Sequence, residues 1–317
     1  MPTLRLFQTL TATLSVVFIS ILLISCGDKD AVDVSLSTPY TLSDQVNTPQ
    51  SRVYTFGFDP RSSPQEDARQ YLPFLKYLEK STGYRFQLRF THKGDDIVDD
   101  IGKGELDFAA IGATSYIHAR TVHNYAISPV VRGVNIQGKD KYRSYFVVRP
   151  DSDIQHLSQI PGHRFAFGSE NSTQGHLIPR IVMQQHGISL AQLSNYQYTG
   201  SHINCANTVV AGLADICAMQ DTMAEDMAEQ GLLRILYQSD YYPSSGIAAS
   251  TRVDKQVTDK VRLALISFRP QGKHSATLYN WHKTEMPKGF VSAKDEDYQA
   301  LQQWMLKLGF IKPEAGS

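Results

Sequence analysis

Residues 104–110, with the sequence GELDFAA, recur in altered form 108 positions later as residues 212–218, GLADICA. Each copy follows an amphipathic stretch, at residues 97–101 and 208–211, and opens a short apolar run. Glycine ends a helix well because it tolerates the left-handed C-cap conformation, and a short apolar run bounded by turn residues is typical of a buried strand in a parallel sheet. The repeat therefore predicts two α/β lobes of similar build, with Asp107 and Asp215 in structural positions where a helix gives way to a strand.

From residue 52 onward the chain alternates between strand and helix patterns, which predicts parallel strands with right-handed connections. Residues 149–153 and 242–246 read as crossings between the lobes. We therefore expect lobe 1 at residues 51–147 plus 245–317 and lobe 2 at residues 148–244, joined by a two-strand hinge suited to closure. Because two-lobed α/β proteins commonly bind their ligand between the lobes, the site is expected in that cleft. Strands are predicted at 53–58, 86–90, 145–148, 164–168 and 196–199, and helices around 73–78 and 175–185.

The first 25 residues have the pattern of a signal peptide. Arg5 precedes an apolar run at residues 14–23, which is about as long as a signal-peptide core and too short to span a bilayer comfortably. The sequence LISC at residues 23–26 resembles the bacterial lipoprotein cleavage box, in which the cysteine is lipidated and becomes the mature N-terminus. An uncleaved membrane anchor with an incidental Cys26 is the alternative.

Residues 26–50 are polar and poor in aromatic side chains, so they are expected to form a flexible, lipid-anchored tether. The protein would then be attached to a bacterial membrane, facing the periplasm or the cell exterior. Gly27 carries no signal for retention in the inner membrane of a Gram-negative cell, and the sequence leaves open which membrane holds the anchor.

The composition excludes some classes of function. Lys and Arg number 31, as do Asp and Glu, so no overall field favours nucleic acid, and any preference for anions must come from a local site. Cys205 and Cys217 remain after lipidation, and an exported protein can hold them either as a disulfide or as two small buried thiols. Their spacing predicts no metal site.

Three segments together carry a resemblance to a known family: residues 104–116, residues 165–179, and residues 199–202 followed by the second copy of the repeat. Over most of residues 52–290 the chain resembles the phosphate/phosphite/phosphonate-binding family of ABC-transporter substrate-binding proteins. The resemblance implies a type II periplasmic-binding fold, no enzymatic activity, no cofactor and no metal. It also implies a small oxyanion as ligand and an ABC permease as partner, and we expect a monomer.

Hydroxyl side chains at predicted helix starts are candidate ligand contacts. Ser172 and Thr173 follow a strand and precede a helix, where unpaired N–H groups and partial positive charge suit a tetrahedral oxyanion. Thr114 and Ser115 form a similar helix start in the other lobe. For both pairs the alternative is an ordinary helix cap.

Three further candidates follow from the resemblance. His202 lies in the Gly-Ser-His phrase that carries the family's ligand-contacting histidine, and Tyr142 matches an aromatic residue at the cleft. Asp221 matches an acidic position that helps to select the amino or protonated-oxygen end of the ligand. A surface aromatic for Tyr142 and a solvated helix-start residue for Asp221 are the alternatives.

The chain also departs from the family pattern. Gln174 stands where the family has a serine, and the side-chain amide of Gln174 both donates and accepts hydrogen bonds. Residues 93–94, Lys-Gly, stand where an aromatic is expected, and Lys93 would favour a more highly charged anion. Ser244 and Ser245 replace an expected aspartate, which argues against an aminophosphonate. The identity of the anion stays open.

Two alternatives to a transport function follow from the same residues. A lipoprotein of this fold could sense its ligand and signal to a membrane partner, which genes for a neighbouring kinase or cyclase would indicate. An enzyme built on Ser172 and His202 is the second alternative, but the sequence lacks a Gly-x-Ser-x-Gly elbow and an obvious orienting third residue.

Overall fold

The computed structural model describes residues 52–58, 63–91 and 96–312. The predicted signal peptide, Cys26, the tether and Lys93 lie outside the described residues. The described residues belong to one unit, which contains two mixed sheets and a small two-stranded sheet formed where the chain passes from one to the other.

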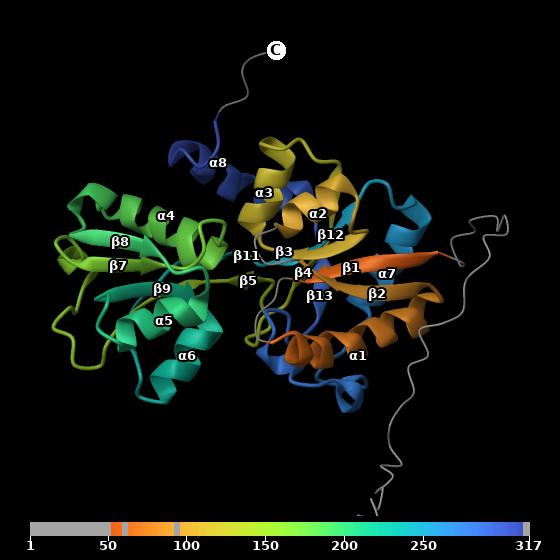
Figure 1. Cartoon of the computed structure of the whole chain (residues 1–317), viewed down its shortest axis with the longest axis horizontal. Helices are drawn as coiled ribbons and strands as arrows, with labels where there is room; N and C mark the ends of the chain where they lie inside the picture. Colours follow the sequence, from red (N-terminus) through yellow and green to blue (C-terminus); the bar gives the residue numbers. More distant parts are fainter. Residues whose placement is uncertain (1–51, 59–62, 92–95, 313–317) are drawn as a thin grey trace, which may run out of the picture. The chain divides into compact units, whose positions relative to one another are not determined.

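The first lobe is built on a six-stranded sheet (Figure 1). β1 runs parallel to β2 and β3, whereas β12 runs antiparallel to β3 and β4. One apolar core packs α1 and α7 against one face of this sheet, and another packs α2 and α3 against the other face. In sheet order the strands are β13 (Phe290–Ser292), β4 (Ile127–Gly133), β12 (Gly246–Ser250), β3 (Phe108–Ile111), β1 (Val53–Phe58) and β2 (Arg85–Phe90), and the helices are α1 (Pro64–Thr82), α2 (Ile97–Lys103), α3 (Ala113–Thr121) and α7 (Lys255–Ile266).

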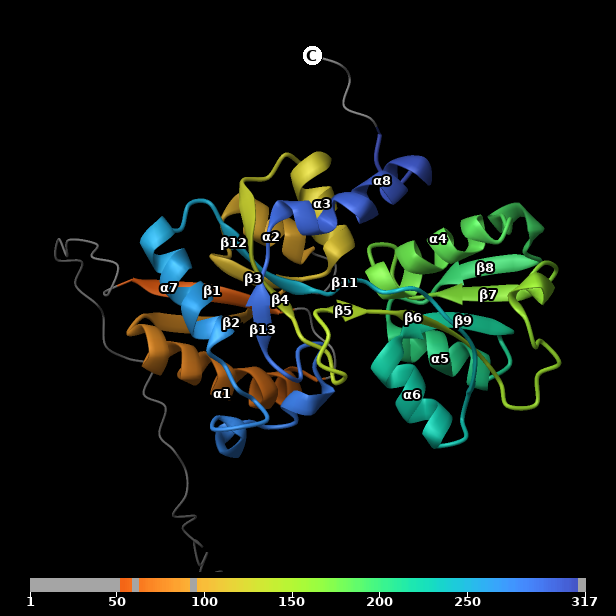
Figure 2. The ribbon, with the colours of Figure 1, turned by 180° about the vertical axis from the view of Figure 1, so that it is seen from behind.

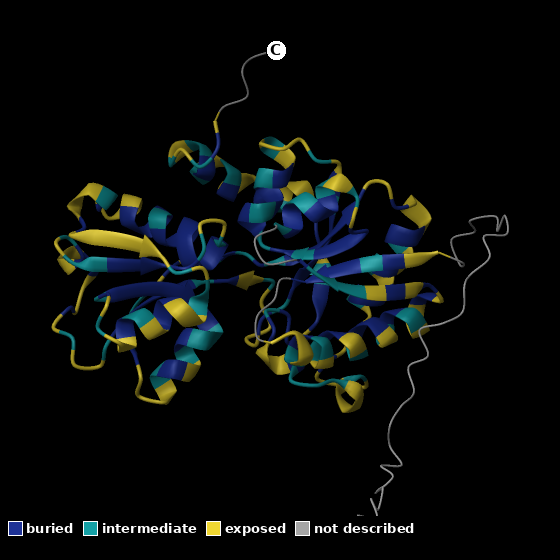
Figure 3. Ribbon diagram, in the orientation of Figure 1, coloured by how far each residue is buried: buried dark blue, intermediate teal, exposed yellow. Residues whose placement is uncertain are grey.

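The second lobe repeats this plan around a five-stranded sheet (Figure 2). β7 is parallel to β8 and β9, and α4 packs on the face opposite to α5. In sheet order the strands are β10 (Arg234–Gln238), β6 (Ser144–Val148), β9 (Ile216–Gln220), β7 (Arg164–Phe167) and β8 (Asn195–Tyr198), and the helices are α4 (Ile178–Gln185), α5 (His202–Val210) and α6 (Asp221–Glu229). Figure 3 shows mostly buried strands in this sheet, with β8 as an exposed edge.

The chain passes between the lobes at a small antiparallel pair, β5 (Lys141–Tyr142) and β11 (Tyr242–Pro243). These strands form the expected two-strand hinge. The predicted first boundary, after residue 147, is placed too late, because β6 pairs with β9 and β10 in the second sheet. The buried apolar run of β6 suits either sheet equally well, so hydrophobicity alone does not assign it to a lobe.

Helix α1 has clear start and stop signals. The Ser63 hydroxyl accepts a hydrogen bond from the backbone N–H of Glu66, Pro64 occupies the first turn, and Gly83 ends the helix with a φ of 72°. The helix therefore begins well before the stretch around residues 73–78 on which its prediction rested.

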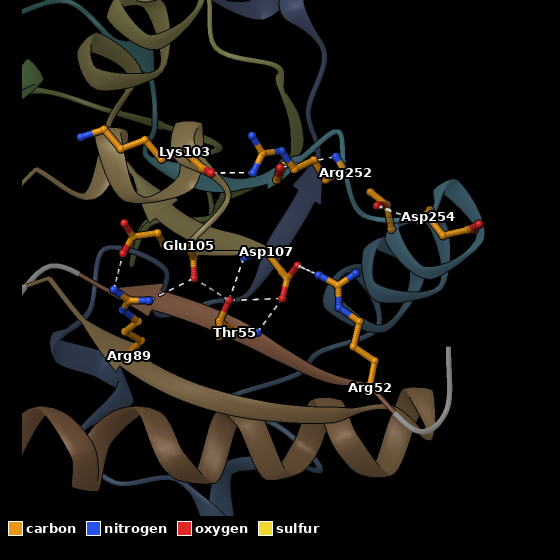
Figure 4. Close-up of polar contacts among 10 residues, drawn as sticks. Arg52, Thr55, Arg89, Lys103, Glu105, Asp107, Arg252 and Asp254 are labelled. Atoms are coloured by element: carbon orange, nitrogen blue, oxygen red, sulfur yellow. Dashed lines mark hydrogen bonds and ion pairs between the residues drawn. The ribbon is translucent and has the colours of Figure 1, made fainter. Parts of the chain in front are cut away.

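The repeated phrase forms the same contact in each lobe (Figure 4 shows the first copy). The Asp107 carboxylate accepts a hydrogen bond of 2.8 Å from the backbone N–H of Thr55, and the backbone N–H of Asp107 donates to the Thr55 carbonyl at 3.2 Å. Asp215 and Arg164 make the matching pair of hydrogen bonds at 2.9 and 3.0 Å. Both aspartates thus hold the start of a central strand, and their predicted structural position is confirmed.

Two features complete the fold. Cys205 of α5 and Cys217 of β9 form a disulfide inside the second lobe. The C-terminal segment contacts both lobes: Tyr116 donates a hydrogen bond to Asp295, and the ring of Phe310 lies 4.7 Å from that of His176. This segment includes α8 (Gln299–Lys307), and short 3₁₀ turns occur at Leu157–Gln159, Leu190–Gln192, Ser275–Thr277, Trp281–Lys283 and Asp295–Tyr298.

Candidate ligand-binding cleft

A cleft of about 620 Å³ lies where residues of both lobes and of the hinge meet. This volume is within the range of small-molecule sites. Six of the eight predicted ligand contacts line the cleft: Ser115, Tyr142, Ser172, Thr173, Gln174 and His202.

Thr173 links the two lobes at this cleft. Helix α3 has Gly112 at its N-cap position and therefore no capping side chain of its own. The hydroxyl oxygen of Thr173 takes that place, because it accepts hydrogen bonds from the backbone N–H and the hydroxyl of Thr114, both at 2.9 Å. Thr114 is fully buried, its hydroxyl is engaged by Thr173, and it is not among the residues that line the cleft, so its predicted contact with the ligand stays a prediction.

Ser172 begins the helical segment of the second lobe. Its hydroxyl accepts a hydrogen bond of 2.9 Å from the backbone N–H of Gly175, so the ordinary capping role holds, and Ser172 also lines the cleft. A π-helical turn, Thr173–Leu177, precedes α4. Such turns are rare in proteins as a whole, and those that do occur are frequently found at functional sites.

His202 is the first residue of α5, which Ser201 caps by accepting a hydrogen bond from the backbone N–H of Asn204. A Cβ added to Gly175 would lie 3.1 Å from the His202 ring and 3.0 Å from the Cα of Gly168. The absence of a side chain at residue 175 therefore lets the start of the helical segment approach the imidazole closely.

Tyr142 brings a buried hydroxyl from hinge strand β5 into the cleft lining. The residue is 4% exposed, and its buried hydroxyl makes no hydrogen bond of standard geometry to the described residues, although the side chains of Thr173 and Ser245 lie close enough to lower its pKa. Burial raises the pKa of Tyr142, so the hydroxyl stays protonated and can donate. An unsatisfied buried polar group costs about 1–3 kcal/mol, which a ligand oxygen at this position would recover.

Asp221 is not among the residues that line the cleft, and its predicted contact with the ligand stays a prediction. Its carboxylate accepts hydrogen bonds from the backbone N–H groups of Arg143 at 3.1 Å and Thr222 at 2.9 Å, and from the Gln174 amide at 3.2 Å. Burial raises the pKa of Asp221, although these hydrogen bonds act in the opposite direction. The carboxylate therefore acts on Gln174 and on the backbone around it.

Two acidic residues that the sequence did not suggest also line the cleft, Asp96 and Glu285. Asp96 caps α2 by accepting from the backbone N–H of Val98, and it accepts a 3.2 Å hydrogen bond from Asn171 of the second lobe. A capping aspartate before an apolar run is a signal that could have been read. Glu285 lies in an irregular stretch with no comparable pattern.

Clustered metal ligands and long apolar helices would each indicate a further function. Among residues 52–58, 63–91 and 96–312, no group of three or more His, Cys, Asp or Glu side chains is placed to hold a metal ion. Within the same ranges, no helix combines the length and apolar character needed to cross a membrane.

Two α/β lobes with mixed sheets, a two-strand hinge and a polar cleft define the periplasmic-binding-protein fold. Residues 56–298 match the family model described as "ABC transporter, phosphonate, periplasmic substrate-binding protein". The chain belongs to this family, whose members are binding proteins and not enzymes.

Individual relatives agree with this assignment. The "Phosphate-import protein PhnD" of Mycolicibacterium smegmatis is 26% identical over 218 residues, covering 64% of this chain and 68% of that protein. The "Probable ABC transporter phosphite binding protein PhnD1" of Prochlorococcus marinus is 26% identical over 273 residues, covering 80% and 84%. The structure of Prochlorococcus marinus PhnD1 in complex with methylphosphonate superposes with a TM-score of 0.70 at 20% identity, over 83% of this chain and 100% of that one, and supports the fold.

Proposed function

We propose that the protein captures a small oxyanion of the phosphonate, phosphite or phosphate type in this cleft and delivers it to an ABC permease. The observation that carries the proposal is the buried, unpartnered hydroxyl of Tyr142 in a cleft that also receives the helix starts at Ser115 and Ser172. Related proteins are named for phosphate and phosphite, which agrees with an anion of this class.

Neutral groups would make most of the contacts to the anion. The described cleft-lining residues include no lysine or arginine, and their charged members are Asp96 and Glu285. Hydroxyl groups, the His202 ring and backbone N–H groups at helix starts remain as donors. Micromolar affinity corresponds to about 8 kcal/mol, which a handful of charge-assisted hydrogen bonds in a closed, dry cleft can supply.

The membrane attachment is also part of the proposal. Lipidation at Cys26 would leave residues 26–50 as a tether, so that the binding lobes stay attached to a membrane and face the periplasm or the cell exterior. Metabolic labelling with a radioactive fatty acid tests this attachment. Label is expected on the wild type and should be absent from Cys26→Ser; equal labelling would refute the anchor.

The binding proposal is tested by thermal unfolding of the purified protein with phosphate, phosphite and methylphosphonate. At least one of these anions is expected to raise the unfolding temperature, and no shift from any at millimolar concentration would refute the oxyanion site. His202→Ala is expected to weaken binding by about 1–3 kcal/mol if the imidazole donates to the anion. Delivery is tested separately, because uptake of the radiolabelled anion should fall in cells that lack the protein.

A further inference from the structure

Gln174 has a fixed amide orientation at the edge of the cleft. The residue lines the cleft and is 4% exposed. Its Nε2 donates one hydrogen bond to the backbone carbonyl of Arg143 at 2.7 Å and another to the Asp221 carboxylate at 3.2 Å. An amide nitrogen carries two protons, so both donors of Gln174 are used inside the second lobe.

The surroundings rule out the reversed orientation. Turning the amide over would place Oε1 against a carbonyl oxygen and a carboxylate oxygen, both of which only accept hydrogen bonds. Asp221 cannot turn away easily, because the backbone N–H groups of Arg143 and Thr222 hold it and it is 5% exposed. The atom of Gln174 that remains for a ligand is therefore Oε1, which can only accept.

We propose that Gln174 makes the cleft selective for an oxyanion that still carries an acidic proton, such as the singly charged form of a phosphonate. The inference rests on the proposed function and deepens it. The ligand O–H donates to Oε1, whereas a fully ionised oxyanion turns an oxygen lone pair toward the same atom. Asp96 and Glu285 in the cleft lining act in the same direction, because they disfavour a second negative charge.

Methylphosphonate and methanesulfonate form a matched pair of probes. When methylphosphonate is singly ionised, the two anions have the same shape and charge and differ by one O–H group. A site built to accept a hydrogen bond from that group rejects the analogue that lacks it. By isothermal titration calorimetry on the purified protein, we expect methylphosphonate to bind at least about 100-fold more tightly than methanesulfonate.

The pH dependence gives a test that needs no variant. At pH values above the second pKa of methylphosphonate, the affinity for this ligand is expected to fall about tenfold per pH unit, because the fraction of the ligand in the singly charged form falls at that rate. The affinity of methanesulfonate, which has no proton to lose, reports any titration of the protein itself. An affinity for methylphosphonate that rises through this range would overturn the inference.

Gln174→Met removes the acceptor with little change in size and is expected to reduce the preference for methylphosphonate at least tenfold. The matched control is Gln220→Met, because Gln220 also lines the cleft but its amide has no hydrogen bond to the described residues and can turn to suit either anion. The control should leave the ratio of the two affinities within about twofold. If Gln174→Met does not fold, Gln174→Ser serves instead, since a hydroxyl can donate or accept.

The outcomes separate this inference from the proposed function. If methylphosphonate binds and methanesulfonate binds equally well, the role of Gln174 is refuted and the oxyanion site stands. An unchanged ratio in a folded Gln174 variant has the same meaning. If phosphate, phosphite and methylphosphonate all fail to bind the wild type, the proposed function is refuted and the inference falls with it.

Discussion

The hydroxyl of Thr173 caps a helix in the opposite lobe, so its removal should change how often the lobes meet. Thr173→Val keeps the shape of the side chain but removes the oxygen that accepts from the N–H and hydroxyl of Thr114. Since Gly112 offers no capping side chain, no other side chain caps that N–H in the described residues. We therefore expect the ligand-free protein to shift toward states in which the lobes are apart and water reaches the start of α3.

The size of the shift follows from the two lost hydrogen bonds. Losing a helix cap costs about 1 kcal/mol, and a buried donor left without an acceptor costs about 1–3 kcal/mol. Thr114 is fully buried, so the penalty applies while the lobes stay in contact and is relieved when they separate. A net change of about 2 kcal/mol would alter the ratio of closed to open molecules by roughly 30-fold.

Single-molecule energy transfer between dyes on the two lobes measures this ratio without any ligand. Leu213 and Leu263 are both 66% exposed and lie in different lobes, so they are suitable labelling positions. Thr173→Ser is the control, because serine keeps the capping oxygen and should retain the wild-type distribution of distances. The reasoning is refuted if Thr173→Val and wild type give the same distribution, or if the serine variant behaves like the valine variant.

Three other predictions concern stability and affinity. Tyr142→Phe should raise the free energy of unfolding of the ligand-free protein by about 1–3 kcal/mol, because it removes the unsatisfied buried hydroxyl, yet weaken anion binding by about 0.5–1.5 kcal/mol. Denaturant unfolding with and without the anion measures both effects, and a loss of stability without loss of binding would contradict the role of Tyr142 as a ligand donor. Hydrogen bonds from Arg164 lower the pKa of Asp215 in the folded state. The ionised carboxylate should therefore stabilise the fold at pH values above the ordinary pKa of 3.8, and this stabilisation should be lost as the pH falls through the lower folded-state pKa. The difference in free energy of unfolding between wild type and Asp215→Ala should shrink in acid, and a constant difference would argue against the ionised pair. Replacing Cys205 and Cys217 by serine should lower the free energy of unfolding by about 2–4 kcal/mol, and a reductant should destabilise the wild type but not the double variant.

The sequence predicted best those features that depend on residues close together in the chain. A glycine after an amphipathic stretch, an aspartate and an apolar run give the same helix end and strand start in both lobes, with φ values of 80° at Gly104 and 69° at Gly212. The helix starts at Ser115 and Ser172 could be predicted for the same reason, since hydroxyl residues after a strand form a local pattern. The boundary after residue 147 was wrong because assignment of β6 to a sheet depends on partners far along the chain.

The roles of individual cleft residues were harder to predict because they depend on long-range contacts. Asp221 and Gln174 are 47 residues apart in sequence, and only the fold brings the carboxylate to the amide. Thr173 and Thr114 are separated by 59 residues and lie in different lobes. A pattern of residue types identifies each as polar and near a helix start, but it does not say which groups are already occupied by other protein atoms.

The paired contacts of Asp107 and Asp215 lie at the opposite ends of the central strands from the cleft. Each joins residues at or near the starts of neighbouring strands, β1 to β3 and β7 to β9, and so helps to define their alignment. Side chains alternate between the two faces of a sheet, so adding one residue between Asp107 and Gly112 would turn the last part of β3 over and rotate the start of α3 away from Thr173. The geometry of the anion site therefore depends on the number of residues between the aspartate contact at one end of each central strand and the cleft at the other end. Insertions in these strands should be tolerated less well than substitutions in the cleft itself.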